Sequence, residues 1–166
     1  MKSEKMGELL ADALILKHSK EDDLDWYKEQ FPNTDEVILL RESFVYELFL
    51  MVMALELHFK ENKEGPETAE YFNVYFSKKL IDASFFKDYS EYKAFSQPRI
   101  EAYNKASREN KEPNYIYWIS KTFCGYCGDD ADPAKIFGIS TAFPLSLKAN
   151  LEFIQNLEKH IASNDD

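Results

Sequence analysis

Residues 44–55, FVYELFLMVMAL, restrict the fold most, because they are apolar in nearly every helical direction. A helix with this pattern is stable only when other elements cover all of its sides. Glu47 interrupts the segment, and Glu56 and His58 follow closely, so the apolar run is shorter than the roughly 20 residues that span a bilayer. The sequence therefore predicts a central core helix at about residues 35–62 and no membrane-spanning segment.

Scarce turn-forming residues and regular apolar spacing predict that the rest of the chain is helical too. The 166 residues include only 5 Gly and 6 Pro, whereas 15% are aromatic. Apolar residues recur at helical spacing in Ser3–His18 and in the segment after Gly65 and Pro66. Tyr115–Ser120 also suits a strand, but a lone strand would lack a partner, so we assign it to a helix. We expect an all-α protein, a single domain over residues 1–166 with about six to eight helices around the central one.

Prolines predict several helix boundaries. Gln97 precedes Pro98 and is biased away from helical geometry, so we expect a kink or break there. Pro133 and Pro144 each fit the first position of a new helix, and Asn33 fits the cap of the central helix. The last helix carries an apolar stripe that either closes the core or faces a second copy of the chain in a homodimer: Leu147, Leu151, Ile154, Leu157 and Ile161.

The acidic composition argues against several classes of partner. The formal net charge is -10 and the sequence pI is about 4.8. Nucleic-acid binding needs clustered Lys and Arg, and the nearest such cluster, residues 99–111, is interleaved with Glu101 and Glu109. Residues 1–20 lack the pattern of a signal peptide, because Glu4 and other acids interrupt a short apolar stretch. We expect no nucleic acid, no membrane contact and a cytoplasmic location.

Cys124 and Cys127 are the only cysteines of the chain, and their spacing is that of redox dithiols and of zinc half-sites. A reactive thiol usually lies at a helix N-terminus, whereas Cys124 is expected at the end of a helix, with Gly125 as its terminator. Asp129 and Asp132 follow closely and would raise the thiol pKa by charge repulsion. The pattern favours two buried side chains at a tight helix end, and a redox pair is the alternative.

No second half of a metal site accompanies the thiols. Zinc would need two further ligands, and His18, His58 and His160 are scattered over different predicted helices. The acidic residues 129–132 lack the order of a calcium-binding loop. Phosphate-binding loops and nucleophile elbows are absent from the sequence as well. We expect no metal and no cofactor.

Glu47 is the carboxylate that we single out for a functional role. Its neighbours one helical turn away are uncharged, whereas Glu56 has Lys60 at a stabilising distance. A buried Glu47 must find a Lys, Arg, Tyr or His on another helix, or keep a raised pKa. Burial beside a cavity would open a further role, as part of a small-ligand pocket within the bundle.

The sequence favours an interaction or regulatory protein over an enzyme. It lacks a recognisable catalytic constellation, is strongly acidic, and has many tyrosines, which are common interface anchors. We predict binding through a surface patch of Tyr71, Tyr75, Tyr89 and Tyr92, with another protein that carries a basic surface as the partner. A thiol-disulfide enzyme or redox sensor that uses Cys124 and Cys127 is the alternative.

Overall fold

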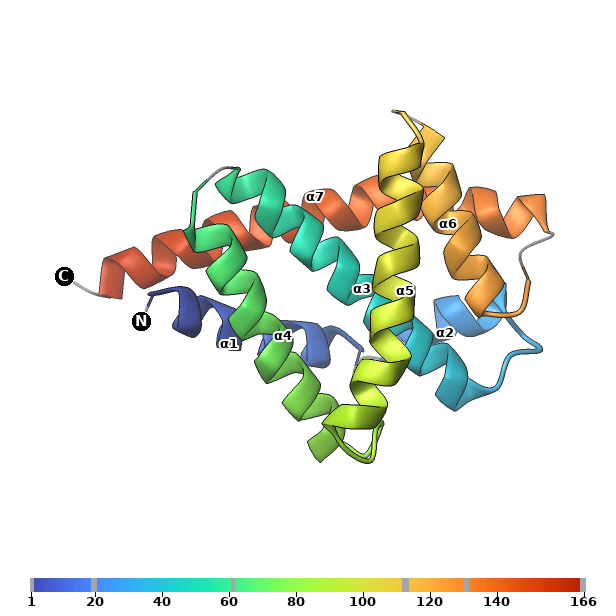
Figure 1. The fold of residues 1–166 in the computed structure, drawn as a ribbon, viewed down its shortest axis with the longest axis horizontal. Coiled ribbons are helices and arrows are strands. Elements are labelled where there is room, and N and C mark those ends of the chain that lie inside the picture. Colours follow the sequence, from blue (N-terminus) through green and yellow to red (C-terminus); the bar gives the residue numbers. More distant parts are fainter. Residues whose placement is uncertain (1, 19–20, 61, 112–113, 130–131, 165–166) are drawn as a thin grey trace.

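The computed structural model describes residues 2–18, 21–60, 62–111, 114–129 and 132–164, without the side chains of residues 18, 21–24 and 164. These ranges form seven helices and no strand, which confirms the all-α prediction and the expected number of helices (Figure 1). The helices are α1 (Lys2–His18), α2 (Glu21–Gln30), α3 (Glu36–Phe59), α4 (Glu64–Asp82), α5 (Tyr89–Glu109), α6 (Asn114–Tyr126) and α7 (Pro133–Asn164).

The long helix α3 is the predicted central helix. Every residue from Glu42 to Met51 is buried, because helices pack against α3 on several sides. The helix is capped by Asp35, whose carboxylate accepts hydrogen bonds from the Val37 and Ile38 amides at 3.0 and 3.1 Å. The predicted cap at Asn33 was therefore wrong, since a carboxylate directly before the first turn can accept from these free amides.

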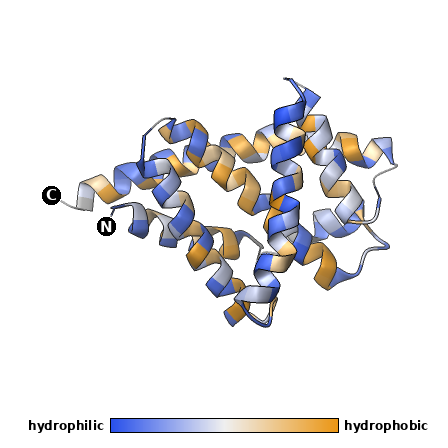
Figure 2. Ribbon diagram, viewed as in Figure 1, coloured by the Kyte–Doolittle hydropathy of each residue, from blue (hydrophilic) through white to orange (hydrophobic). Residues whose placement is uncertain are grey.

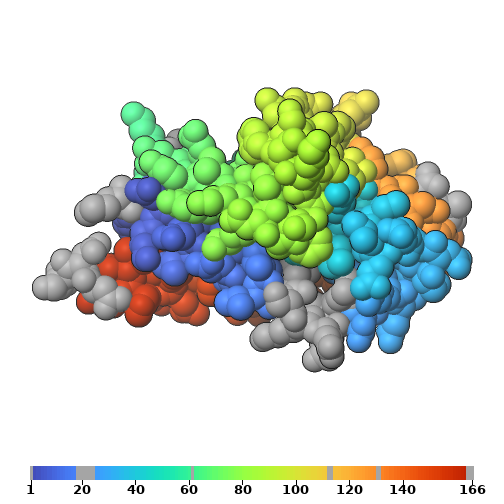
Figure 3. Space-filling view, turned by 90° about the horizontal axis from the view of Figure 1, so that it is seen from below, coloured from blue at the N-terminus to red at the C-terminus, as the bar shows by residue number. Residues whose placement is uncertain are grey.

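The other helices surround α3 in layers. α4 and α5 cover one side of α3 and diverge from their connection at residues 83–88, while α7 covers the other side (Figure 1). α1 lies between α4 and the C-terminal half of α7 (Figure 3). Apolar residues run along α3, whereas α5 is mostly hydrophilic (Figure 2). Within the described ranges, none of the helices has the length and apolarity needed to cross a membrane.

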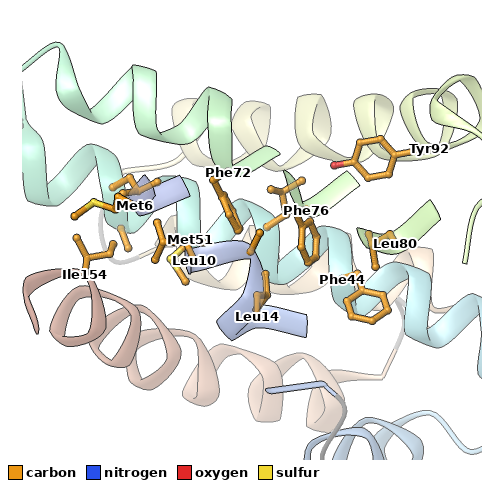
Figure 4. Packing of buried hydrophobic residues seen from close by; sticks show 14 of the residues in the cluster. Met6, Leu10, Leu14, Phe44, Met51, Phe72, Phe76, Leu80, Tyr92 and Ile154 are labelled. Carbon is orange, nitrogen blue, oxygen red and sulfur yellow. The ribbon is translucent and has the colours of Figure 1, made fainter. Parts of the chain in front are cut away.

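Two buried clusters, which we call the first and second cores, meet along α3. The first core is formed mainly by α1, α3 and α4 (Figure 4), and it includes Met6, Leu10, Leu14, Phe44, Met51, Phe72, Phe76, Leu80, Tyr92 and Ile154. The second core lies among α2, α3, α5, α6 and α7 and is rich in rings, including Tyr27, Phe31, Tyr46, Phe49, Tyr103, Phe123 and Phe143. Many of the aromatic residues thus fill the interior.

The stripe predicted on the last helix closes the first core. Ile154 and Ile161 are buried, and Leu147, Leu151 and Leu157 are partly buried against the same cluster. The stripe therefore takes the first of the two roles that the sequence allowed. A homodimer through other faces of α7 stays a prediction.

The chain stays helical through two of its prolines, so the helix start predicted at Pro144 was wrong, and the break that was one of the two outcomes expected at Pro98 does not occur. α5 continues through Pro98, and α7 continues from Pro133 through Pro144. An internal proline removes one backbone hydrogen bond and costs about 3 kcal/mol. Buried side chains on both sides of each proline, such as Tyr92 and Tyr103 in α5, pack into the core and stabilise the continuous helix. Tertiary packing therefore overrides the local preference.

Candidate functional site

A groove lies between α4 and α5, with α3 as its floor. Its volume is about 550 Å³. The side chains of Leu48, Phe49, Val52 and Met53 form an apolar floor. The groove exists because α4 and α5 diverge from their short connection and leave this part of α3 between them (Figure 1). Ile100 of α5 also lines it. A hollow of this volume with mostly apolar lining is the usual form of a ligand-binding site.

The charged side chains of the groove are exposed and mostly acidic. Glu56, Glu70 and Glu101 come from α3, α4 and α5 in that order, and Lys93 is the cation among the charged lining residues. Their charges are separated from the apolar floor, as in the polar rim of a protein interface. The rim therefore presents a negative potential around an apolar strip.

The four tyrosines predicted as one patch lie in two different places. Tyr89 and Tyr92 line the groove, but Tyr92 is buried in the first core and its hydroxyl donates to Asn73 Oδ1 at 2.7 Å. Burial raises the pKa of Tyr92 well above its ordinary value, so the hydroxyl stays a donor. Tyr71 and Tyr75 lie on the α1 side of α4, where the Tyr75 hydroxyl donates to Glu4 at 3.3 Å. Of these tyrosines, Tyr89 offers an exposed ring to the groove.

A second, smaller cavity lies near the buried carboxylate of Glu47. Glu47 is 3% exposed, and its Oε1 accepts hydrogen bonds from Lys17 Nζ at 3.0 Å and from the Tyr27 hydroxyl at 3.4 Å. The other oxygen, Oε2, is buried and receives no hydrogen bond from the described residues. Burial, followed by the nearby Glu47 charge, raises the pKa of Tyr27, which keeps this hydroxyl protonated.

The cavity beside Glu47 has a volume of about 180 Å³ and mostly apolar walls. Trp26, Tyr27, Tyr46 and Phe143 contribute rings, and Ile139 adds an aliphatic surface. The sequence had singled out Glu47 because its helical neighbours are uncharged. The cavity itself forms from α1, α2, α3 and α7, and this convergence is not visible in local spacing.

Glu42 is a second buried carboxylate on α3, which the sequence analysis missed. Arg99 of α5 donates to both of its oxygens, from Nη2 at 2.5 Å and from Nε at 2.7 Å. The guanidinium also lies 3.6 Å from the centre of the Phe95 ring and donates to the Phe95 carbonyl. Burial raises the pKa of Glu42, and the hydrogen bonds from Arg99 oppose this effect. The available signal in the sequence was the position of Glu42 one turn before Tyr46, just before the apolar segment 44–55.

The two cysteines are free thiols buried in the second core. Burial, with a further contribution from Asp129, raises the pKa of the Cys124 thiol to about 12. Burial also raises the pKa of Cys127 well above its ordinary value. A thiol that stays protonated at neutral pH is a poor nucleophile. This environment favours packing over redox chemistry.

The helix that carries the thiols ends later than predicted. α6 continues to Tyr126, and Gly128 adopts a φ of 84°. The Gly128 amide donates to the Gly125 carbonyl at 3.0 Å, and the Asp129 amide donates to the Cys124 carbonyl at 2.8 Å. This is the Schellman arrangement, which requires a left-handed residue after the helix. Gly128, not Gly125, is therefore the terminator.

Neither a metal-ligand cluster nor a similar protein of known function identifies a further site. No cluster of three or more His, Cys, Asp or Glu side chains suited to a metal ion occurs among the residues that the structure describes. No family model, no curated protein and no solved structure matches the chain. A functional proposal therefore depends on the geometry of the groove and of the Glu47 cavity.

Proposed function

We propose that this chain is a non-catalytic interaction protein that binds a basic, amphipathic helical segment of a partner protein in the groove between α4 and α5. The observation that carries the proposal is an apolar floor on α3 bordered by an exposed, predominantly acidic rim. A helix that lays its apolar face into such a groove is a common mode of peptide recognition.

The length of the groove supports an elongated occupant. Its lining residues on α5 extend from Tyr89 to Ser107, which corresponds to about 27 Å along the helix axis. A partner helix of about 18 residues has the same length. Leu48, Val52 and Met53 would contact its apolar face.

The charge of the rim supports a basic occupant. Glu70 and Glu101 come from the two helices that form the groove walls, and Glu56 comes from α3. Lysine or arginine side chains beside the apolar face of a partner helix would approach these carboxylates. Rim charges mainly guide association and select the partner, while burial of the apolar strip supplies the affinity.

Binding of a model peptide tests the charge of the rim. The probe is a helix-forming peptide of leucine and lysine, of about 18 residues, whose affinity is measured by fluorescence anisotropy. The double substitution Glu70→Gln and Glu101→Gln should weaken binding about three- to tenfold, because it removes two exposed charge contacts. Glu29→Gln with Glu152→Gln is the matched control, since these exposed carboxylates lie outside the groove and the net charge changes equally.

A variant of the groove floor distinguishes binding in the groove from a general attraction of the basic peptide to an acidic surface. Val52→Thr with Met53→Gln keeps shape and net charge but makes the floor polar, and it should weaken binding about tenfold. An equal loss in the control pair and the rim pair, with no effect of the floor variant, would contradict the proposal. Tight binding of a small apolar molecule in place of the peptide would assign the groove to another occupant and would also contradict it.

The remaining features fit this proposal. Both cysteines are free thiols, which is the usual state in the cytoplasm, and we keep that location as the proposed one. Cys124 and Cys127 then serve as packing residues of the second core.

A further inference from the structure

We propose that the cavity beside Glu47 is a separate site for a small uncharged molecule with an apolar body and one hydrogen-bond donor, of the size of a phenol. It is lined by residues of α1, α2, α3 and α7, whereas the groove is lined by α3, α4 and α5. A ligand here would therefore be distinct from the partner segment proposed for the groove.

The free oxygen of Glu47 defines the polar end of the ligand. A carboxylate accepts hydrogen bonds only, and a buried oxygen without a donor carries a cost in free energy. Lys17 and Tyr27 both bind Oε1, whereas Oε2 has no donor among the described residues, and the Glu47 side chain lines the cavity. The group that fits this oxygen is a hydroxyl or an N–H of the occupant.

The charge balance of the cavity selects a neutral ligand. The Glu47 carboxylate is already paired with the Lys17 ammonium at 3.0 Å, so this pair adds no net charge to the site. A charged ligand would leave water for a largely apolar cavity whose one carboxylate is already paired with Lys17, which is unfavourable. An uncharged donor group leaves the existing pair intact.

The walls and the volume define the apolar end of the ligand. Rings of Trp26, Tyr46 and Phe143 line a space of about 180 Å³. Such walls pack well against a single ring in an edge-to-face or offset arrangement. A one-ring alcohol or phenol with its donor on Glu47 meets both requirements.

Fluorine NMR with two ring-shaped probes tests this inference in the full chain. The probes are 4-fluorophenol, which carries a donor, and fluorobenzene, which has nearly the same shape and none. We expect 4-fluorophenol to bind about tenfold more tightly, because the buried carboxylate would stay unsatisfied with the other probe. 4-Fluorobenzylamine, which is a cation at neutral pH, should bind more weakly than the phenol.

Two variants locate the binding. Glu47→Met keeps the length of the side chain and removes the acceptor, so the difference between phenol and fluorobenzene should disappear. Ala142→Met fills the cavity and keeps the carboxylate, and it should abolish binding of both probes; this variant also covers the case in which Glu47→Met does not fold.

Three results would overturn the inference: no binding of 4-fluorophenol at millimolar concentration, equal affinity for both aromatic probes, or loss of binding in the floor variant of the groove. Binding of the leucine and lysine peptide should be unchanged by Glu47→Met. The two sites can therefore fail independently.

Discussion

Glu42 and Glu47 are buried carboxylates on the same helix, α3, but their surroundings differ. Both oxygens of Glu42 are bound by Arg99, whose guanidinium also contacts the Phe95 ring. One oxygen of Glu47 is bound by Lys17 and Tyr27, and the other is buried without a donor from the described residues, while the Glu47 side chain lines a cavity. Glu42 is a closed site, because the protein supplies donors to both of its oxygens. Glu47 is an open site, because one of its oxygens lacks a donor from the described residues.

In our proposal, this difference separates a structural role of Glu42 from a binding role of Glu47. The Glu42–Arg99 pair joins α3 to α5 and so fixes one wall of the groove, which Ser96 and Ile100 line from α5. Glu47 has no comparable clamp, because the Lys17 side chain is 38% exposed. Burial alone therefore does not identify a functional carboxylate, and the number of satisfied oxygens is more informative.

The largest expected effect comes from breaking the closed site. Glu42→Met should lower the free energy of unfolding by about 3–5 kcal/mol, since it leaves the Arg99 guanidinium largely buried without its counter-charge. Urea denaturation measures the change. Glu56→Met, an exposed carboxylate of the same helix, is the control and should change the stability by less than about 0.5 kcal/mol. Similar losses in both variants would mean that the ion pair has no special role.

The same substitution at the open site should cost less. Glu47→Met should lower the free energy of unfolding by about 1–3 kcal/mol, because the buried Tyr27 hydroxyl loses its acceptor, while removal of the unsatisfied Oε2 offsets part of this loss. Lys17 can then be hydrated, since its side chain is partly exposed. The measurement is the same urea titration. A loss as large as that of Glu42→Met would abolish the contrast between the two sites.

At alkaline pH, ionisation of a buried thiol should also lower the free energy of unfolding, by less than the carboxylate substitutions do. Burial raises the pKa of Cys124 to about 12, whereas an unfolded thiol ionises at about 8.5. The stability that this thiol contributes is therefore fully present below about pH 8.5 and is lost as the pH rises towards 12. Cys124→Ala should make the fall in unfolding free energy over this range shallower than in the unsubstituted protein.

A matched variant separates ionisation from packing. Ser120→Ala removes a buried side-chain oxygen one turn earlier in α6 and keeps both thiols. It should lower the stability at every pH by a similar amount and keep the alkaline slope. An unchanged slope in Cys124→Ala would show that the thiol ionises alike in the folded and unfolded chain.

The sequence predicted those features that depend on local pattern. The apolar segment 44–55 indicated the buried central helix, and Glu47 stood out because no charged residue lies one turn away. Pro98 and Pro144 misled the prediction of helix boundaries, because packing on both sides of a proline is a tertiary effect.

The binding geometry could not be predicted from the sequence. The groove depends on the angle at which α4 and α5 diverge, and the Glu47 cavity depends on four helices that meet in space. Spacing along one helix carries no information on either. For the same reason Tyr71 and Tyr89, assigned to one patch, lie in different places, Tyr71 against α1 and Tyr89 in the groove.

Heteronuclear NMR during titration with the basic amphipathic peptide shows directly where the peptide binds. Binding in the groove should change the chemical shifts of its floor, at Leu48, Val52 and Met53, and along the groove side of α4 and α5. The residues of the Glu47 cavity that lie on α7, such as Ile139, should stay unchanged. Changes spread evenly over the acidic surface, or confined to α7, would contradict the account.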